Sequence, residues 1–360
     1  MKKVVTVIGA RPQFVKAAVL SKIIKKHNTI QEVIIHTGQH FDANMSAVFF
    51  EEMMIPKPAY NLEVNSLSHA AMTGQMMGKI EEILEIERPE ALIVYGDTNS
   101  TIAGALAAKK MNIKVVHIEA GLRSFNMNMP EEINRILTDR ISDLLSCPSQ
   151  GAINNLHNEG FQNLPVLIEN HGDIMKDAVS YYSQFSVNKS SIIKDQKLQK
   201  NEFVLATIHR QENTDEISKL TAIFKALEEI HHTQPVILPL HPRTRMALEK
   251  VDIQPKINLI DPIGYYDMLE LLKNCSMVIT DSGGLQKEAF FTKKQCIVVR
   301  DETEWGELVA HGYAKVVGSN TKKIIQTFDT FRATKKEFTV DLYGNNVGEK
   351  IYQSIYQLIH

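Results

Sequence analysis

The sequence has few cysteines and no long apolar run. Its three cysteines, Cys147, Cys275 and Cys296, are widely spaced and lie in apolar surroundings, so we expect neither a disulfide framework nor a metal quartet. They are predicted to be buried thiols in a reducing cytosol. No stretch reaches the roughly 18 apolar residues of a membrane span, and the run that follows Lys2 and Lys3 is too short for a signal peptide. These absences predict a cytoplasmic protein without a membrane partner.

The sequence also has little net charge. Forty basic side chains face forty-two acidic ones, which gives a net charge of −2. No long-range positive field exists to hold nucleic acid or an anionic membrane. An anionic ligand must therefore be bound by local groups. The 360 residues are enough for two domains that each bury a core.

Short apolar runs alternate with helical patterns along the chain. Strands are predicted in the runs 4–9, 32–38, 91–98, 114–121, 203–210, 235–242, 257–264, 276–284 and 295–302. Helices are expected through Lys25, around Met45 to Met53 and through Lys110. This alternation is typical of parallel sheets covered by helices on both faces. The predicted fold class is α/β, with two Rossmann-like, doubly wound domains.

A polar, lysine-rich segment at 172–200 separates the two series of strands. We therefore predict an N-terminal domain at 1–168 and a C-terminal domain at 169–344. The last segment, 345–360, has apolar residues at helical spacing and should form an amphipathic helix docked on a domain. These residues are Val347, Ile351, Ile355 and Leu358.

Ligands of open parallel sheets bind where strands end, so the residues after each run are the candidates for a site. After the first run come Gly9 and Arg11, and the next helix carries Lys16. A glycine turn, two cations and a helix start can hold a phosphate, although a plain turn with solvated cations is the alternative. The pattern is not G-x-G-x-x-G, which disfavours a dinucleotide site.

Three acidic residues of the first half are candidate acid and base groups. Asp97 and Glu119 follow two strands, and Glu131 begins a helix. Neighbouring, partly desolvated carboxyl groups acquire separated pKa values, as general acid–base catalysis requires. The alternatives are a helix N-cap for Asp97 and a favourable helix-terminal charge for Glu131.

Basic residues take the same positions in the second half. His209 and Arg210 follow one strand, and His241 and Arg243 follow the next. A single histidine is more often structural, but two such pairs at consecutive strand ends indicate anion binding.

The run 276–284 ends in a serine and paired glycines. Ser282, Gly283 and Gly284 open a helix whose free N–H groups can hold a phosphate. Glu288 lies further along this helix, where it could accept hydrogen bonds from ribose hydroxyls. The alternative for Glu288 is a solvated surface position.

Seven motifs together resemble those of the non-hydrolysing UDP-N-acetylglucosamine 2-epimerases. They occur in the family's order and cover nearly the whole chain: GARPQ, GDTNST, HIEAGLRS, MPEEINR, TIHRQEN, DSGGLQKEA and RDETEW. The resemblance implies a fold like that of the GT-B glycosyltransferases. That fold has two Rossmann-like domains, an interdomain cleft and a C-terminal helix that returns to the first domain.

The resemblance implies C2 epimerisation of a UDP-sugar. UDP would be eliminated across C1 and C2 to leave 2-acetamidoglucal and then added back, which interconverts UDP-N-acetylglucosamine and UDP-N-acetylmannosamine for surface polysaccharide precursors. No cofactor, nicotinamide or metal is required. A homodimer is also implied, and the stretch from Met72 to Met77 is a candidate for its interface, with ordinary core as the alternative.

The resemblance also assigns roles to individual positions. Asp97, Glu119 and Glu131 match the family's catalytic acids, and His209 matches its essential histidine near the phosphates. Groups that match its UDP and cation sites are Arg11, Lys16, Ser282, Gly283, Gly284 and Glu288. In some bacterial members a second, regulatory UDP-N-acetylglucosamine is bound by positions that match Gln39, His40, Arg210 and His241.

One motif departs from the pattern of the enzymes that act on UDP-N-acetylglucosamine. The segment from Arg300 to Trp305 reads RDETEW, where those enzymes commonly have DTTERPE. The E-T-E-W form also occurs in relatives that act on UDP-2,3-diacetamido-glucuronic acid, which is therefore the alternative substrate. More remote alternatives are a hydrolysing epimerase, a GT-B glycosyltransferase and a nucleotide-binding module without catalysis.

Overall fold

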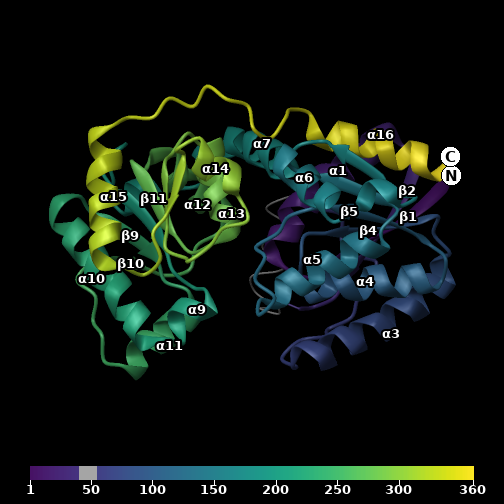
Figure 1. The fold of residues 1–360 in the computed structure, drawn as a ribbon, viewed down its shortest axis with the longest axis horizontal. Helices are drawn as coiled ribbons and strands as arrows, with labels where there is room; N and C mark the ends of the chain where they lie inside the picture. Colours follow the sequence, from purple (N-terminus) through teal and green to yellow (C-terminus); the bar gives the residue numbers. More distant parts are fainter. Residues whose placement is uncertain (40–54) are drawn as a thin grey trace. The chain divides into compact units, whose positions relative to one another are not determined.

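The computed structural model describes residues 1–39 and 55–360, which form two compact units (Figure 1). The first unit consists of Met1–Ala178 and Asp341–His360, and the second of Val179–Val340. The division falls inside helix α7 (Ile174–Lys189), whereas the sequence placed the boundary after residue 168. The first turn of α7 belongs to the first unit because the Asp173 N–H donates to the Tyr343 carbonyl and Asp177 accepts from the Gly348 N–H, at 2.9 Å each.

The first unit contains a sheet in which all the pairs are parallel. Its order is β3-β2-β1-β4-β5-β6-β7. The strands are β1 (Lys2–Ile8), β2 (Ile30–His36), β3 (Tyr60–Asn61), β4 (Ala91–Tyr95), β5 (Lys114–Ile118), β6 (Leu144–Cys147) and β7 (Leu167–Asn170). The predicted runs 4–9, 32–38, 91–98 and 114–121 are confirmed as strands. The helix expected around Met45 to Met53 lies outside the described residues.

Helices cover both faces of this sheet (Figure 1). One face carries α3 (His69–Glu87), α4 (Asn99–Lys110) and α5 (Pro130–Ile141), and the other carries α1 (Arg11–His27) and α16 (Val347–Ile359). The apolar core under α3 and α4 includes Met76, which is fully buried, while Met72 and Met77 pack against that core. The expected homodimer stays a prediction. Met76, which belongs to the stretch named as a candidate for its interface, is buried in the core of this unit. A short helix, α6 (Gln150–Asn158), packs on β6 and β7 and is followed by the 3-10 turn η1 (Phe161–Asn163).

The last helix packs on α1 through its apolar face. Val347, Ile351 and Ile355 are fully buried, whereas Leu358 is only half-buried because Ile359 takes the buried position at the helix end. The Ser354 hydroxyl bonds to buried His171 at 2.9 Å. The predicted amphipathic helix therefore completes the first unit.

The second unit repeats the architecture with a six-stranded parallel sheet. Its order is β10-β9-β8-β11-β12-β13. The strands are β8 (Val204–Thr207), β9 (Val236–Pro239), β10 (Asn258–Ile260), β11 (Met277–Thr280), β12 (Cys296–Val298) and β13 (Ala314–Val316). All five runs predicted in this half are confirmed. The helices are α8 (Ile192–Asp195), α9 (Gln211–Thr214), α10 (Ile217–Thr233), α11 (Pro242–Lys250), α12 (Tyr265–Asn274), α13 (Gly283–Phe291), α14 (Gly306–Ala310) and α15 (Thr321–Ala333).

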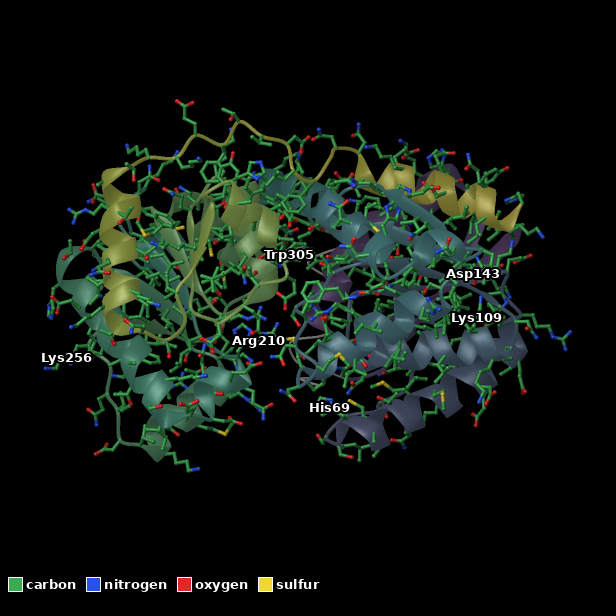
Figure 2. The ribbon with its side chains drawn as sticks, in the orientation of Figure 1. His69, Lys109, Asp143, Arg210, Lys256 and Trp305 are labelled. Carbon is green, nitrogen blue, oxygen red and sulfur yellow. The ribbon has the colours of Figure 1, made fainter. Side chains whose placement is uncertain are left out.

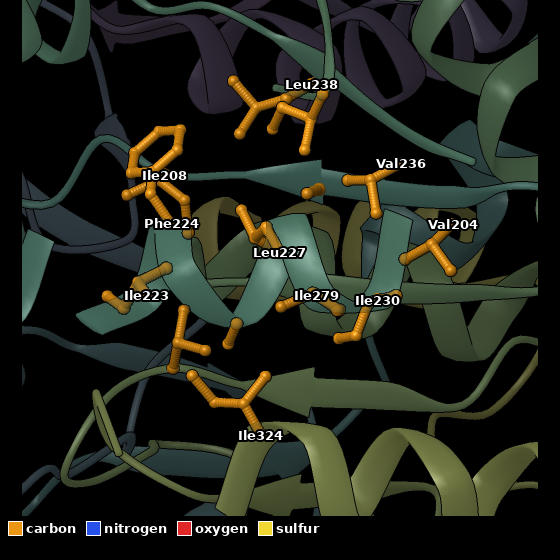
Figure 3. Packing of buried hydrophobic residues seen from close by; sticks show 14 of the residues in the cluster. Val204, Ile208, Ile223, Phe224, Leu227, Ile230, Val236, Leu238, Ile279 and Ile324 are labelled. Atoms are coloured by element: carbon orange, nitrogen blue, oxygen red, sulfur yellow. The ribbon is translucent and has the colours of Figure 1, made fainter. Parts of the chain in front are cut away.

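Figure 3 shows the apolar core on one face of the second sheet. Phe224, Leu227 and Ile230 of α10 face Val204 of β8 and Val236 of β9. Helix α15 packs beside α10 and contributes Ile324 to the same core. Helices α12 and α13 lie on the opposite face (Figure 1). Both faces of the parallel sheet are thus covered, which explains its near-continuous apolar strands.

The three cysteine side chains are buried within the two units. All three thiols are free and buried, as predicted. Burial raises the pKa of Cys275 to about 12 and also raises the pKa values of Cys147 and Cys296. Among the described helices, none is both long and apolar enough to cross a membrane.

Candidate active site

Each sheet has one point where the direction of the chain reverses. In the first unit the chain builds outward from β1 to β3 and then returns to place β4 beside β1; in the second, β11 returns beside β8 in the same way. Ligands of doubly wound sheets bind at the carboxyl ends of the strands at such switch points. Predicted site residues of each unit lie around the switch point of that unit.

Gln13 ties together the two loops of the first switch point. Its side-chain oxygen accepts from the N–H groups of Gly9 and Ala10 at 2.8 and 3.0 Å. Its amide nitrogen donates to the Tyr95 carbonyl at 2.8 Å and to Thr98 at 2.9 Å. The turn before α1 is therefore fixed to the turn after β4.

Gly9 allows the chains to approach closely at this point. A Cβ atom there would lie 2.0 Å from the Thr37 hydroxyl and 2.3 Å from the Ser100 hydroxyl. Arg11 begins α1, and its side chain lies outside the described part of the structure. Lys16, on the same helix, is buried.

Lys16 forms an ion pair with Glu119 at the end of β5. Glu119 has a φ of 72°, an uncommon conformation for a residue with a side chain, and strain of this kind concentrates at functional sites. Gly96, which has a φ of 61°, lies beside the pair: a Cβ atom there would be 3.1 Å from the Glu119 carboxylate. A side chain at position 96 would displace this carboxylate.

Asp97 is held by a cation from helix α5. Its carboxylate accepts from the Arg135 guanidinium at 2.6 Å, and Arg135 also donates to the buried Glu132 at 2.9 Å. The N-cap of α4 is Thr98, whose hydroxyl accepts from the Thr101 N–H. The alternative that Asp97 caps this helix is therefore wrong.

Glu131 and Glu132 lie side by side in the first turn of α5 but differ in their surroundings. Glu131 is half-buried. Glu132 is buried and accepts from the N–H groups of Ser124 and Phe125 at 2.9 Å each, so it shapes the loop before α5. The two neighbouring acidic residues therefore differ in burial, and Glu132 is the one that holds the loop.

A buried ionic cluster lies beneath this loop. The His117 ring bonds to Asp139 at 2.7 Å and to the Gly96 carbonyl at 2.7 Å. Asp139 also accepts from the Gly121 N–H at 3.1 Å and from Arg123 at 2.7 Å. The Glu159 carboxylate completes the cluster by a two-point contact with Arg123 at 2.7 and 2.8 Å.

Asp281 organises the second switch point. It is fully buried and accepts from the N–H groups of His209 and Arg210 at about 3 Å, as well as from the Asn213 amide at 3.1 Å. The His209 ring nitrogen lies 3.5 Å from the same carboxylate. Asp281 therefore fixes the loop after β8 while the His209 side chain remains about one-third exposed.

Two arginines of the second unit lie near the start of α13, and one of them, Arg210, is labelled in Figure 2. Ser282 is the N-cap and accepts from the Leu285 N–H. A Cβ atom on Gly283 would lie 3.8 Å from the guanidinium groups of both Arg210 and Arg300 and 3.6 Å from Glu304. Free N–H groups at a helix start and nearby guanidinium groups together form an anion-binding site.

Arg300 keeps its charge although it is buried. Burial opposes the charge, but two contacts with Glu304, at 2.9 and 3.0 Å, raise its pKa. Next to Glu304, Trp305 packs under the Lys287 ammonium at 3.9 Å. The E-T-E-W segment therefore lies against helix α13.

The remaining candidates of the second unit occupy different places. Glu288 is 8% exposed, so the alternative of a solvated surface position is wrong. His241 caps α11 and its ring lies 5.5 Å from that of His209. Arg243 is half-exposed and lies 3.8 Å from Asp215.

The candidate regulatory residues come from both units. Gln39 is in the first unit, where it accepts from Ser100 at 2.7 and 3.0 Å, and His40 lies outside the described residues. Arg210 is in the second unit near the α13 start, and the regulatory role of these residues stays a prediction.

A family model for UDP-N-acetylglucosamine 2-epimerase matches residues 22–356. The chain belongs to this family. It is 50% identical to the UDP-2,3-diacetamido-2,3-dideoxy-D-glucuronate 2-epimerase of Pseudomonas aeruginosa, over 95% of this chain and 96% of that one. The epimerase family also accounts for the fold. The solved UDP-GlcNAc 2-epimerase of Methanocaldococcus jannaschii, in complex with UDP-GlcNAc and UDP, has a TM-score of 0.91 at 37% identity over 99% of both chains. The Neisseria meningitidis enzyme bound to UDP-GlcNAc has a TM-score of 0.87 at 32% identity, over 99% of this chain and 100% of that one.

Several residues that shape the candidate site were not predicted from the sequence to do so. Gln13, Arg135 and Asp281 bond to predicted residues, whereas Asp139 holds the loop after β5 and Arg300 lies near the α13 start. All of these except Asp139 lie inside motifs that carry the family resemblance, which is the signal that could have identified them. Asp139 lies outside these motifs and follows no strand.

Proposed function

We propose that this protein inverts C2 of a UDP-2-acetamido sugar by elimination and re-addition of UDP. The first candidate pair is UDP-N-acetylglucosamine and UDP-N-acetylmannosamine, as precursors of a surface polysaccharide. The main support is the first switch point, where two carboxylates, Glu119 and Asp97, are each held beside a cation. Such contacts hold the two carboxyl groups in fixed positions, as acid–base catalysis requires.

The proposed reaction has two balanced halves. A carboxylate takes the proton from C2, the electron pair forms the C1–C2 double bond, and the C1–O bond breaks as UDP leaves. UDP then adds back to C1 of the 2-acetamidoglucal while an acid delivers a proton to the opposite face of C2. Because removal and delivery use opposite faces, at least two acidic groups are needed, and Asp97, Glu119 and Glu131 are the candidates.

The second unit is proposed to bind the UDP part. The helix start at Ser282 and Gly283, with Arg210 and Arg300 nearby, can stabilise the diphosphate as it leaves, because negative charge develops there when the C1–O bond breaks. Glu288 is the candidate acceptor for the ribose hydroxyls. His209 is proposed to act on the diphosphate, since its ring is partly exposed while its backbone is fixed by Asp281.

A second candidate substrate is UDP-2,3-diacetamido-2,3-dideoxy-D-glucuronate. Its support is the 50% identity to the Pseudomonas aeruginosa 2-epimerase that is named for it. The E-T-E-W segment also favours it, because this segment resembles the form found in relatives that act on that nucleotide. Both candidates share the 2-acetamido group and require the same chemistry at C2.

One time course tests the proposal. The protein is incubated with each nucleotide in turn, without an acceptor, and the anomeric proton signals are followed by NMR. We expect the C2 epimer of one or both nucleotides to appear with UDP still attached. Release of UDP and free sugar would indicate a hydrolysing epimerase, and binding of UDP without turnover of either nucleotide would contradict the proposal.

A further inference from the structure

His117 lies at the base of the first switch point with an acceptor at each ring nitrogen. The side chain is fully buried at the end of β5. Its Nδ1 lies 2.7 Å from an Asp139 carboxylate oxygen, and its Nε2 lies 2.7 Å from the Gly96 carbonyl oxygen. A carbonyl oxygen has no hydrogen to give, so Nε2 must be the donor in that contact.

The Asp139 contact requires the second ring hydrogen as well. If Nδ1 carried no hydrogen, Asp139 would have to be protonated. Its other oxygen, however, accepts from the Gly121 N–H at 3.1 Å and from the Arg123 guanidinium at 2.7 Å, and both contacts favour the ionised carboxylate. Burial alone would raise the pKa of Asp139, yet its contacts with His117 and Arg123 hold this pKa below the ordinary value.

The charges of the cluster balance locally. The groups around the ring are Asp139 from α5, Arg123 from the loop after β5 and Glu159 from the end of α6. The Cys147 thiol of β6 is also close enough to Asp139 to feel its charge. Burial is the main cause of the raised pKa of this thiol, and the charge of Asp139 raises that pKa further. With a charged ring, two cations face two carboxylates, so a buried positive charge on His117 is compensated.

The same bonds reach the backbones of both catalytic loops. Nε2 holds the carbonyl of Gly96, the residue before Asp97. Asp139 holds the N–H of Gly121, two residues after Glu119, whose own φ of 72° needs support from its surroundings. One ring and one carboxylate thus connect the loop after β4 to the loop after β5.

We propose that His117 carries a hydrogen on both ring nitrogens and that, with Asp139, it is a positioning residue that sets the distance between the Asp97 and Glu119 carboxylates. The proposal rests on the proposed function, because it assigns both carboxylates to the reaction at C2. Neither His117 nor Asp139 touches the substrate. Loss of either should misplace the acid and base without removing them.

The charge is tested by nitrogen-15 NMR of the histidine rings in the full chain. The His117 resonances are identified by their loss in His117→Gln. We expect both ring nitrogens of His117 to be protonated at neutral pH, because each faces an acceptor. A neutral tautomer with one bare nitrogen at this pH would overturn the proposal. This measurement uses wild-type protein and does not depend on epimerase activity.

The positioning role is tested with Asp139→Asn, which keeps the shape of the side chain. We expect kcat to fall by on the order of a hundredfold, the scale expected for a misplaced catalytic group, with KM and UDP affinity changed by less than about twofold. His157→Gln, at an exposed histidine of the same unit, is the matched control and should keep wild-type kcat. Because Asp139→Asn could unfold, circular dichroism and UDP binding are measured on the same sample.

If that variant is unfolded, Arg123→Lys is the second variant, since it keeps the charge beside Asp139 but not the two-point contact with Glu159. It should lower kcat by about tenfold with KM unchanged, a loss smaller than that of Asp139→Asn. A folded variant of either kind with wild-type kcat contradicts the positioning role. Inactivity of the wild type on both nucleotides would instead contradict the proposed function, and the NMR result would still decide the charge of His117.

Discussion

At the first switch point acidic side chains follow β4 and β5, whereas at the second basic side chains follow β8. Asp97 and Glu119 follow β4 and β5, each paired with a cation that comes from a helix. His209 and Arg210 follow β8, and the nearby acid, Asp281, is fully buried against their backbone N–H groups. The comparison teaches that the topology determines where ligand groups collect, while the residue after the strand determines which charge the ligand meets.

The largest effect should come from the acidic switch point. Glu119→Gln should lower turnover by on the order of a hundredfold or more, the usual scale for a positioned acid or base, and Asp97→Asn and Glu131→Gln should do the same. UDP binding should remain close to that of the wild type because these groups act on the sugar. NMR turnover and calorimetric binding of UDP measure the two effects. Glu81→Gln, at an exposed acid of α3, is the control.

A second variant tests whether the basic switch point has the opposite profile. Arg210→Ala should weaken UDP binding by about tenfold to about a hundredfold, because a hydrogen bond to a charged group contributes roughly 1.5–3 kcal/mol. Calorimetry with UDP measures the change. Arg245→Ala removes an exposed arginine of the same unit, which pairs with the exposed Asp261 at 2.9 Å, and should bind UDP normally. Equal affinity in the two variants would remove the distinction between the switch points.

The buried acid of the second unit should affect stability more than chemistry. In Asp281→Asn the amide cannot accept all the N–H groups that the carboxylate accepts, so the free energy of unfolding of this unit should fall by about 1–3 kcal/mol. Urea denaturation followed by circular dichroism measures it. Asp261→Asn, at an exposed acid, should leave the midpoint unchanged.

The smallest effect concerns the thiols, which lie in the cores of both units. Burial raises the pKa values of Cys147, Cys275 and Cys296, and a protonated, inaccessible thiol reacts slowly with disulfide reagents. We expect almost no reaction with Ellman's reagent in native protein and reaction of all three cysteines in guanidinium. Rapid reaction of any one in the native state would show that its core opens easily.

Much of the fold could be predicted because the central strands are local apolar runs. The strands that were not predicted are β3, β6, β7 and β13, which are short, and three of these are edge strands. In β7, Leu167 is 48% exposed and Asn170 is exposed, so the apolar signal that marks a buried strand is absent there. An edge strand is defined by its hydrogen bonds to a neighbouring strand, and the sequence alone does not show this pairing.

The candidate site could be predicted in part for the same reason. Asp97, Glu119 and Ser282 follow strands directly, so their positions could be derived from local patterns and topology. The residues that hold them could not, because Arg135 lies 38 residues from Asp97 and Asp281 lies 72 residues from His209. Only the packed fold brings these partners together, and only burial distinguishes Glu132 from Glu131.

The most direct test of the account is the reaction of the wild-type protein in deuterium oxide. If carboxylates of the first unit remove the C2 proton and return another, the epimerised nucleotide will carry deuterium at C2, because the proton on a carboxyl group exchanges with solvent. Proton NMR of the product would then show the C2 signal lost and the anomeric signal simplified. Full retention of protium at C2, with normal turnover, would contradict elimination and re-addition and the roles assigned to Asp97, Glu119 and Glu131.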